Sequence, residues 1–188
     1  FTGTPAAPTA AGATNTTQIA TTAMVQAAIP LSTAITGVRR LAQTSTATRT
    51  TVGTGTTQIP GDDSIPQITE GDEYLTISFT PTNASSTLKI RASCTAAHSI
   101  AGVGLVLALF QDAVSNALAV GWATTPQINY CVPLNAYHEM TAGTTSAITF
   151  RLRLGGNAAG TTTVNGATGA RLYGGVGLLR ITVDEYLP

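Results

Sequence analysis

Five of the nine acidic residues lie in one short segment, IPGDDSIPQITEGDEY, which spans residues 59–74. Clustered carboxylates can coordinate calcium, or they can serve a glycosidase as general acid and base. The spacing is not that of an EF-hand loop, and Pro60 and Pro66 limit how closely the acids approach one centre. We therefore interpret the segment as a structural connector and keep a metal site and catalysis as alternatives. The acids are Asp62, Asp63, Glu70, Asp72 and Glu73.

The chain contains two histidines, His98 and His138. His138 lies between Tyr137 and Glu139, and this is the best polar cluster for proton transfer. Neighbouring residues of a strand point to opposite faces, so a working pair would require a bend. No nucleophile elbow or phosphate-binding loop accompanies the histidines. We predict no catalytic residue, no metal, no cofactor and no enzymatic activity.

The two cysteines, Cys94 and Cys131, can form one disulfide at most. Cys94 ends an alternating run in which Leu88, Ile90 and Ala92 share its face. A cysteine in that position is typical of a buried hydrophobic contact. We therefore predict a buried free thiol rather than a disulfide.

Five cations occupy the polar faces of predicted strands. If those strands share a sheet, the cations form a basic stripe that can bind phosphate or carboxylate groups of a bacterial surface polysaccharide. The alternative is a solvated outer face, or partners for acidic residues across a subunit boundary. The cations are Lys89, Arg91, Arg151, Arg153 and Arg180.

Aromatic side chains offer a second kind of binding surface, because their faces stack on sugars and anchor protein contacts. Trp122, in the sequence VGWATTP, is the preferred candidate, and a core tryptophan that covers one end of the fold is the alternative. The receptor-binding candidates are Trp122, Tyr130, Tyr137, His138, Tyr173, Arg151 and Arg153.

The composition of the 188 residues narrows the function classes. Nine basic residues balance nine acidic ones, and 10% of the residues are charged, against roughly 25% in an average protein. This balance provides no attraction for nucleic acid, and no apolar stretch is long enough to cross a membrane. The 35 threonines and 29 alanines favour strands and close packing between chains, as in fibrous assemblies. The chain begins with Phe1, so we expect a processed form or a piece of a longer polypeptide.

Residues 15–29, NTTQIATTAMVQAAI, predict a helix. Asn15 and Gln18 have the spacing of a capping box, and Pro30 ends the helix. A second short helix is predicted after Pro30, with an apolar seam that reaches Ala42. These helices bury too little apolar surface to order a single chain, so we predict a stalk of identical chains over residues 1–46. Its interface candidates are Ile19, Ala23, Met24, Ala27, Leu31, Ile35 and Val38.

From residue 47 onward the hydrophobic period changes to two, with frequent turn signals. This pattern predicts a mainly β head over residues 47–188, an antiparallel β-sandwich of jelly-roll type. The predicted strands are residues 48–53, 74–80, 87–95, 103–110, 117–123, 128–134, 147–154, 161–165 and 176–184.

The segment VGLVLALF, residues 103–110, is apolar on both faces. A strand of an antiparallel sandwich that is buried on both faces needs a second cover. We predict that the neighbouring subunit supplies it, with Val106 and Phe110 in the interface. Leu178, in the sequence VGLLRITV, is a further interface candidate.

The run TGTPAAPTAAGATNTTQIATTAMVQAAI, residues 2–29, resembles the tail-fibre repeat of tailed bacteriophages. The segment at residues 59–71 also looks like one that leads from stalk to head in phage fibres, and RLYGGVGLLRITV resembles the last strand of trimeric C1q/TNF-like jelly rolls. These resemblances imply a homotrimeric receptor-binding protein of a virion. The implied partners are other virion tail proteins and a bacterial surface polysaccharide or outer-membrane protein. The alternatives are a fibre spacer or trimerisation cap, and a polysaccharide depolymerase.

Overall fold

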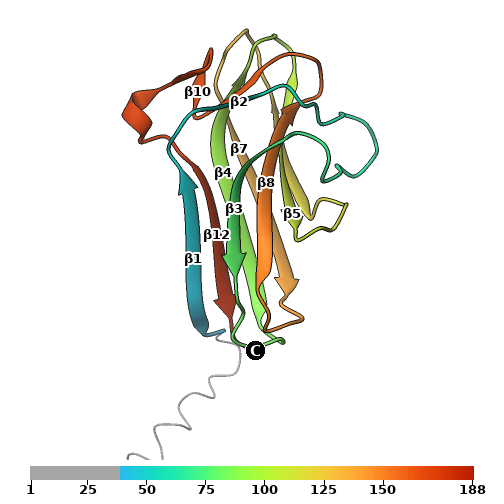
Figure 1. The fold of residues 1–188 in the computed structure, drawn as a ribbon, viewed down its shortest axis with the longest axis vertical. Coiled ribbons are helices and arrows are strands. Elements are labelled where there is room, and N and C mark those ends of the chain that lie inside the picture. Colours follow the sequence, from blue (N-terminus) through green and yellow to red (C-terminus); the bar gives the residue numbers. More distant parts are fainter. Residues whose placement is uncertain (1–38) are drawn as a thin grey trace, which may run out of the picture. The chain divides into compact units, whose positions relative to one another are not determined.

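The structure is a computed structural model that describes residues 39–188, which form one compact unit (Figure 1). The first predicted stalk helix, the second up to residue 38, and the interface candidates from Ile19 to Val38 lie outside the described residues. The long strands are β1 (Leu41–Arg49), β3 (Asp72–Phe79), β4 (Thr87–His98), β5 (Gly104–Gln111), β6 (Ala119–Thr124), β7 (Val132–Thr141), β8 (Ile148–Gly156) and β12 (Leu179–Tyr186). The short elements are β2 (Gly53–Gly55), β9 (Thr162–Val164), β10 (Gly166–Ala167), β11 (Ala170–Arg171) and the 3-10 helix η2 (Tyr173–Gly175). No helix within residues 39–188 has the length and apolar character needed to span a membrane.

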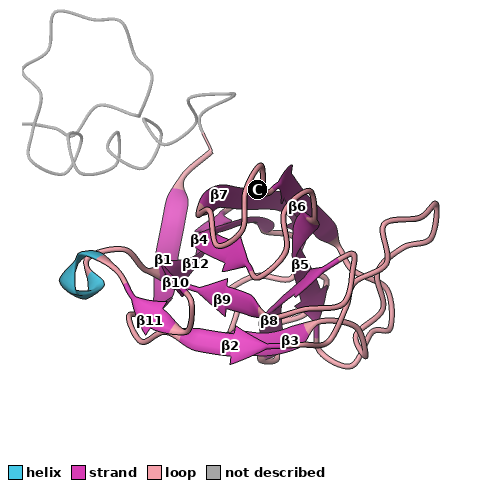
Figure 2. Ribbon diagram, turned by 90° about the horizontal axis from the view of Figure 1, so that it is seen from above, coloured by secondary structure: helices cyan, strands magenta, loops and turns pink. Residues whose placement is uncertain are grey.

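The long strands form two antiparallel sheets that face each other (Figures 1 and 2). The first sheet has the order β1-β12-β4-β7, and short strands β9 and β2 extend it from the end of β4. The second sheet has the order β3-β8-β5-β6. The chain crosses between the sheets from β3 to β4, β4 to β5, β6 to β7, β7 to β8 and β8 to β12, which is the connectivity of a jelly roll. The predicted antiparallel β-sandwich is therefore confirmed.

The core lies between the sheets and follows the alternation of the strands. In β4 every second residue from Leu88 to Cys94 is buried, and in β8 Phe150, Leu152 and Leu154 are fully buried. Alternation buries one face of each strand because successive side chains point to opposite sides. Cys94 and Cys131 are both free, and Cys94 is buried, as predicted.

The second face of β5 is covered by the chain itself. Residues 56–71, which we call the strap, connect β2 to β3 and cross the outer face of the second sheet. Ile59 of the strap is fully buried against Ala108 and Phe110, and Ile68 packs on the same cluster. Phe110 has no exposed surface, so its predicted place in a subunit interface is wrong. Val106 remains partly exposed, because the strap covers only part of this face.

Two predicted boundaries also differ from the structure. Strand β1 begins at Leu41, so the predicted helical seam at Ala42 is wrong, and the predicted boundary after residue 46 lies inside this strand. The strand was missed because LAQTSTATR alternates only between small and polar residues, which give a weak period-two signal. Residues 128–131 form a loop rather than a strand, and β7 continues to Thr141.

Candidate functional site

An exposed tryptophan stands at the edge of the second sheet. Trp122 lies on edge strand β6, directly opposite Val106 of β5, and 70% of its surface is exposed. Gly121 faces the first sheet at very close range, since a Cβ there would lie 1.8 Å from the Asn135 carbonyl oxygen. Strand alternation therefore directs Trp122 outward. The alternative that Trp122 belongs to the core is wrong.

A groove of about 360 Å³ separates Trp122 from the strap. Val106 and Gly104 of β5 form its floor, and Trp122 and Val120 of β6 form one wall. The tip of the strap forms the opposite wall. The strap residues that line the groove are Pro60, Gly61, Asp62, Ser64 and Pro66.

The strap is anchored on both sides of its tip, so this wall has a defined position. The Ile59 amide donates to the Gly156 carbonyl at 3.1 Å, and the Ile68 amide donates to the Ser115 carbonyl at 2.8 Å. Within the tip, the Ser64 amide donates to Asp62 Oδ1 at 2.9 Å, and the Ser64 hydroxyl donates to the same oxygen. This local turn is a common role of aspartate and presents the second carboxylate oxygen of Asp62 to solvent.

Asn157 also lines the groove. Its backbone amide donates to the Gly104 carbonyl at 2.9 Å, and its Oδ1 accepts from the Gly104 amide at 2.9 Å. Because Oδ1 must face that donor, Nδ2 is left as a donor to a ligand. Gly61 and Gly104 leave room for this side chain, since a Cβ at either position would lie 2.9 or 3.1 Å from Nδ2.

The groove is weakly negative. Among the described residues that line it, Asp62 is the single charged side chain. Hydrogen bonds from the hydroxyl and amide of Ser64 lower the pKa of Asp62, so the carboxylate is ionised at neutral pH. The site therefore combines an aromatic face, a carboxylate acceptor, an amide donor and the hydroxyls of Ser64 and Thr124.

The other aromatic candidates lie apart from Trp122. Tyr130 is half-exposed in the loop between β6 and β7, and Tyr137 is half-exposed on the outer face of the first sheet. Tyr173 is 83% exposed in η2, which projects beyond β11 (Figure 2). The structure does not bring these tyrosines into one site with Trp122. Leu178, the interface candidate near η2, is partly buried ahead of β12.

The cluster around His138 has no geometry for proton transfer from the histidine. Strand β7 is continuous through this region, so Tyr137 and Glu139 share the outer face while His138 lies on the other. The Tyr137 hydroxyl donates to Glu139 Oε2 at 2.8 Å. Burial lowers the pKa of His138, which therefore favours its neutral form.

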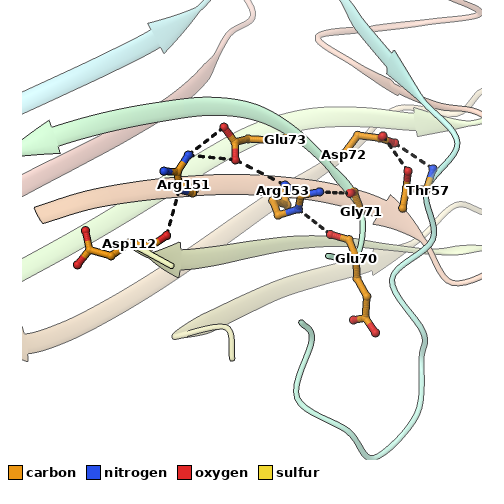
Figure 3. Close-up of polar contacts among 8 residues, drawn as sticks. All are labelled: Thr57, Glu70, Gly71, Asp72, Glu73, Asp112, Arg151 and Arg153. Carbon is orange, nitrogen blue, oxygen red and sulfur yellow. Dashed lines mark hydrogen bonds and ion pairs between the residues drawn. The ribbon is translucent and has the colours of Figure 1, made fainter. Parts of the chain in front are cut away.

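Arg151 and Arg153 are held in the fold (Figure 3). Both pair with Glu73, at 3.3 Å and 3.5 Å respectively. Arg151 also donates to the Asp112 carbonyl, and Arg153 donates to the carbonyls of Glu70 and Gly71 at 2.8 and 2.7 Å. These contacts fix the end of the strap to β8 and give both guanidinium groups partners within the chain.

The predicted basic stripe is divided between the two sheets. Lys89, Arg91 and Arg180 lie on the first sheet, whereas Arg151 and Arg153 lie on the second. Lys89 pairs with Glu139, and Arg91 pairs with Asp184. A single basic stripe over all five cations is therefore wrong. Four of the five cations pair with acidic residues of the same chain, rather than with acids across a subunit boundary. Arg91, Arg180 and Tyr137 line a shallow hollow on the first sheet.

Two further acids of residues 59–74, Glu70 and Asp72, also hold the strap. Asp72 accepts from the amide and hydroxyl of Thr57 at 3.0 and 2.8 Å, and Glu70 accepts from the Gln67 amide at 2.9 Å (Figure 3 shows the Asp72 contacts). Within residues 39–188 there is no group of three or more acidic, histidine or cysteine side chains suited to a metal. These contacts support the interpretation of a structural connector.

Sequence reasoning missed Asn157 and the role of Asp62 in the groove. Asn157 lies in the turn GGNAAG, and nothing in that local pattern distinguishes it from an ordinary turn asparagine. For Asp62 the sequence suggested a place in a structural connector, with metal binding and catalysis as the alternatives, and no part in a groove. The available signal was the pair of prolines that flank GDDSI, which indicates a rigid loop tip.

Residues 56–187 match the protein family described as the Pgp3 C-terminal domain. No protein with a curated description matches the chain. Among solved structures, Eiger TNF from S. frugiperda is similar at 11% sequence identity with a TM-score of 0.43, over 79% of this chain and 94% of that one. Infectious bursal disease virus, Gx strain, is similar at 11% identity and a TM-score of 0.37, over 78% of this chain and 37% of that one. A CocE/NonD family hydrolase from Staphylococcus aureus is similar at 9% identity and a TM-score of 0.32, over 79% of this chain and 34% of that one. These three similarities carry no functional inference.

Proposed function

This chain belongs to the Pgp3 C-terminal domain family, and on that premise we propose that it is a homotrimeric head that attaches to a cell surface without enzymatic action. Family membership supports the trimeric β-sandwich. It does not support the tail-fibre identification, which rests on the run at residues 2–29 and lies outside the matched residues. Because of that run we extend the proposal to a virion fibre that attaches to a bacterial host. Its further partners are then other virion tail proteins.

The observation that carries the proposal is the exposure of Trp122 beside the groove. A tryptophan with 70% of its surface in water, next to a hollow with polar groups at fixed positions, is typical of a binding site. Exposed aromatic side chains are also frequent anchors of protein contacts. Three such sites on one trimer multiply a weak individual affinity by about 100-fold to 10,000-fold when they bind together.

Binding of the labelled full chain to a panel of bacterial cells tests this function. We expect saturable binding that Trp122→Ala reduces at least tenfold, because avidity multiplies the loss at each site. Val176→Ala is the control, since it truncates an apolar side chain that is 82% exposed and lies outside the lining of the groove. A head that serves only as a fibre spacer or trimerisation cap would bind no cells at all, and that result across the panel overturns the proposal.

The oligomeric state is tested by light scattering. We expect a mass three times the 19.1 kDa of one chain at micromolar concentration. A mass of one chain contradicts the trimer. Release of reducing ends from surface polysaccharide would instead establish a depolymerase.

A further inference from the structure

We propose that the groove at Trp122 binds an uncharged sugar unit of a surface glycan and discriminates against acidic sugars. This inference rests on the proposed attachment function and names the ligand class of that site. It replaces the acidic polysaccharide that the predicted basic stripe suggested.

The polar groups of the groove match a ligand that carries many hydroxyls. Asp62 can only accept hydrogen bonds, the free Nδ2 of Asn157 can only donate them, and the hydroxyl of Thr124 can do both. The Ser64 hydroxyl already donates to Asp62, so it can only accept from a ligand. A sugar hydroxyl both donates and accepts, so neighbouring hydroxyls satisfy Asp62 and Asn157 together. An apolar peptide segment would leave Asp62 desolvated without a partner, which is unfavourable.

The apolar groups of the groove match the C–H face of a sugar ring. The Trp122 ring is exposed, and Val106 and Val120 extend its apolar surface on the same face of the sheet. A volume of about 360 Å³ is near the lower limit of small-molecule pockets, so a short stretch of ligand fits and a folded partner does not.

Charge decides between neutral and acidic sugars. Asp62 is the single charged group among the described lining residues, and Asp63 follows it on the same loop tip. No described lysine, arginine or histidine lines the groove. A uronic acid would bring a second carboxylate towards Asp62 without a cation to compensate, and like charges brought together disfavour binding.

The strap explains why a groove exists at this place. Ile59 and Ile68 cover Ala108 and Phe110, whereas Trp122 on edge strand β6 keeps 70% of its surface exposed. The outer face of the second sheet is therefore filled at its centre and left hollow beside Trp122.

The chain contains one tryptophan, so its intrinsic fluorescence reports directly on the groove. We would titrate the full chain with cellotriose, maltotriose, mannotriose and chitotriose, and in parallel with trigalacturonate. At least one neutral trisaccharide is expected to change the emission and to bind at least tenfold more tightly than trigalacturonate. The binding should change little with salt, because no net charge on the ligand is involved.

Two variants test whether the carboxylate that lines the groove, rather than nearby charge, affects binding. Asp62→Asn keeps the shape and removes the carboxylate, and should weaken sugar binding about tenfold or more while reducing discrimination against trigalacturonate. Asp63→Asn removes the same charge one residue away, outside the lining of the groove, and should leave the affinity within about twofold.

Three outcomes overturn the inference. The first is that none of the neutral trisaccharides changes the emission, the second is that trigalacturonate binds equally well, and the third is that binding falls steeply with salt, as a cationic partner requires. If cells still bind the chain through Trp122 in those cases, the attachment function stands and its receptor is not a neutral sugar. Loss of the trimer in Trp122→Ala would instead place this residue between subunits.

Discussion

The buried carboxylate of Glu185 provides the sharpest test of the fold, through the substitution Glu185→Gln. Glu185 lies on β12 with no exposed surface and accepts hydrogen bonds from three residues. The Thr82 amide and hydroxyl each donate at 2.9 Å, the Asn83 amide donates at 3.2 Å, and Gln43 Nε2 donates at 2.8 Å. These bonds attach β1 and the turn after β3 to the last strand.

Glutamine has the same shape as glutamate but replaces one acceptor oxygen by a donor. If the amide oxygen keeps the bonds from Thr82 and Asn83, the new NH₂ group faces Gln43 Nε2, which is also a donor. One charge-assisted bond is lost, at about 1.5–3 kcal/mol, and the remaining bonds weaken to neutral ones. We therefore expect a loss of about 3 kcal/mol in the free energy of unfolding. For a head of this size the loss corresponds to a decrease of roughly 6–12 °C in Tm.

The pH dependence gives a second, independent measure. Burial by itself raises the pKa of Glu185, but the nearby Ser86 hydroxyl and hydrogen bonds from Thr82 and Gln43 outweigh it and lower the pKa to about 2 from an ordinary 4.5. A carboxylate with a lowered pKa in the folded state stabilises the protein above pH 4.5, and this contribution is lost as the pH falls from 4.5 towards 2. The stability difference between the natural chain and Glu185→Gln should therefore narrow in that window.

Urea unfolding followed by far-UV circular dichroism, at fixed protein concentration, measures both effects. The matched control is Glu139→Gln, the same substitution at an exposed glutamate, for which we expect a much smaller change because solvent screens its ion pairs with Arg39 and Lys89. The reasoning is refuted if the two variants lose equal stability at pH 7, or if the difference for Glu185 does not narrow in acid.

Three further predictions concern groups buried within the head. Phe110→Ala should lower the free energy of unfolding in urea by about 3–5 kcal/mol, because it opens a cavity under the strap, and should leave the mass in light scattering unchanged. A change in mass without a loss of stability would instead place Phe110 in a subunit interface. Burial raises the pKa of the Cys94 thiol to about 12, so Ellman's reagent should modify the partly exposed Cys131 before Cys94. Equal rates of modification at the two cysteines would contradict the burial of Cys94. Burial lowers the pKa of His98 and so favours the neutral ring in the folded state, and the free energy of unfolding should therefore fall as the pH drops below 6.5. His98→Asn should make this dependence of the unfolding free energy on pH less steep, and an unchanged dependence would contradict the role of His98.

Much of the sandwich could be predicted because strand alternation is a local property. Leu88, Ile90 and Ala92 share one face with Cys94 in the sequence, and that face is buried in the structure. The same alternation identified both faces of residues 103–110 as apolar, and both are in contact with other groups. A period of two follows from backbone geometry alone, so it needs no information about distant residues.

What covers each face depended on the tertiary structure. The apolar outer face of β5 was assigned to a neighbouring subunit, whereas Ile59 and Ile68 of the same chain cover it. The cations Arg151 and Arg153 were assigned to a receptor, whereas Glu73 of β3 pairs with both. A hydrophobic or charged face requires a partner, but its pattern does not say where in the chain that partner lies.

The sequence by itself determined that this chain forms a β-sandwich and that Trp122 is a candidate for binding. Only the tertiary structure decided that Trp122 faces water and lines one groove together with Asp62 and Asn157. These three residues come from β6, the strap and the turn after β8, and hydrogen bonds to distant backbone groups fix their positions. Local sequence carries the direction of a side chain relative to its strand, whereas the meeting of segments far apart in the chain depends on how the two sheets pack and on the path of the strap across them.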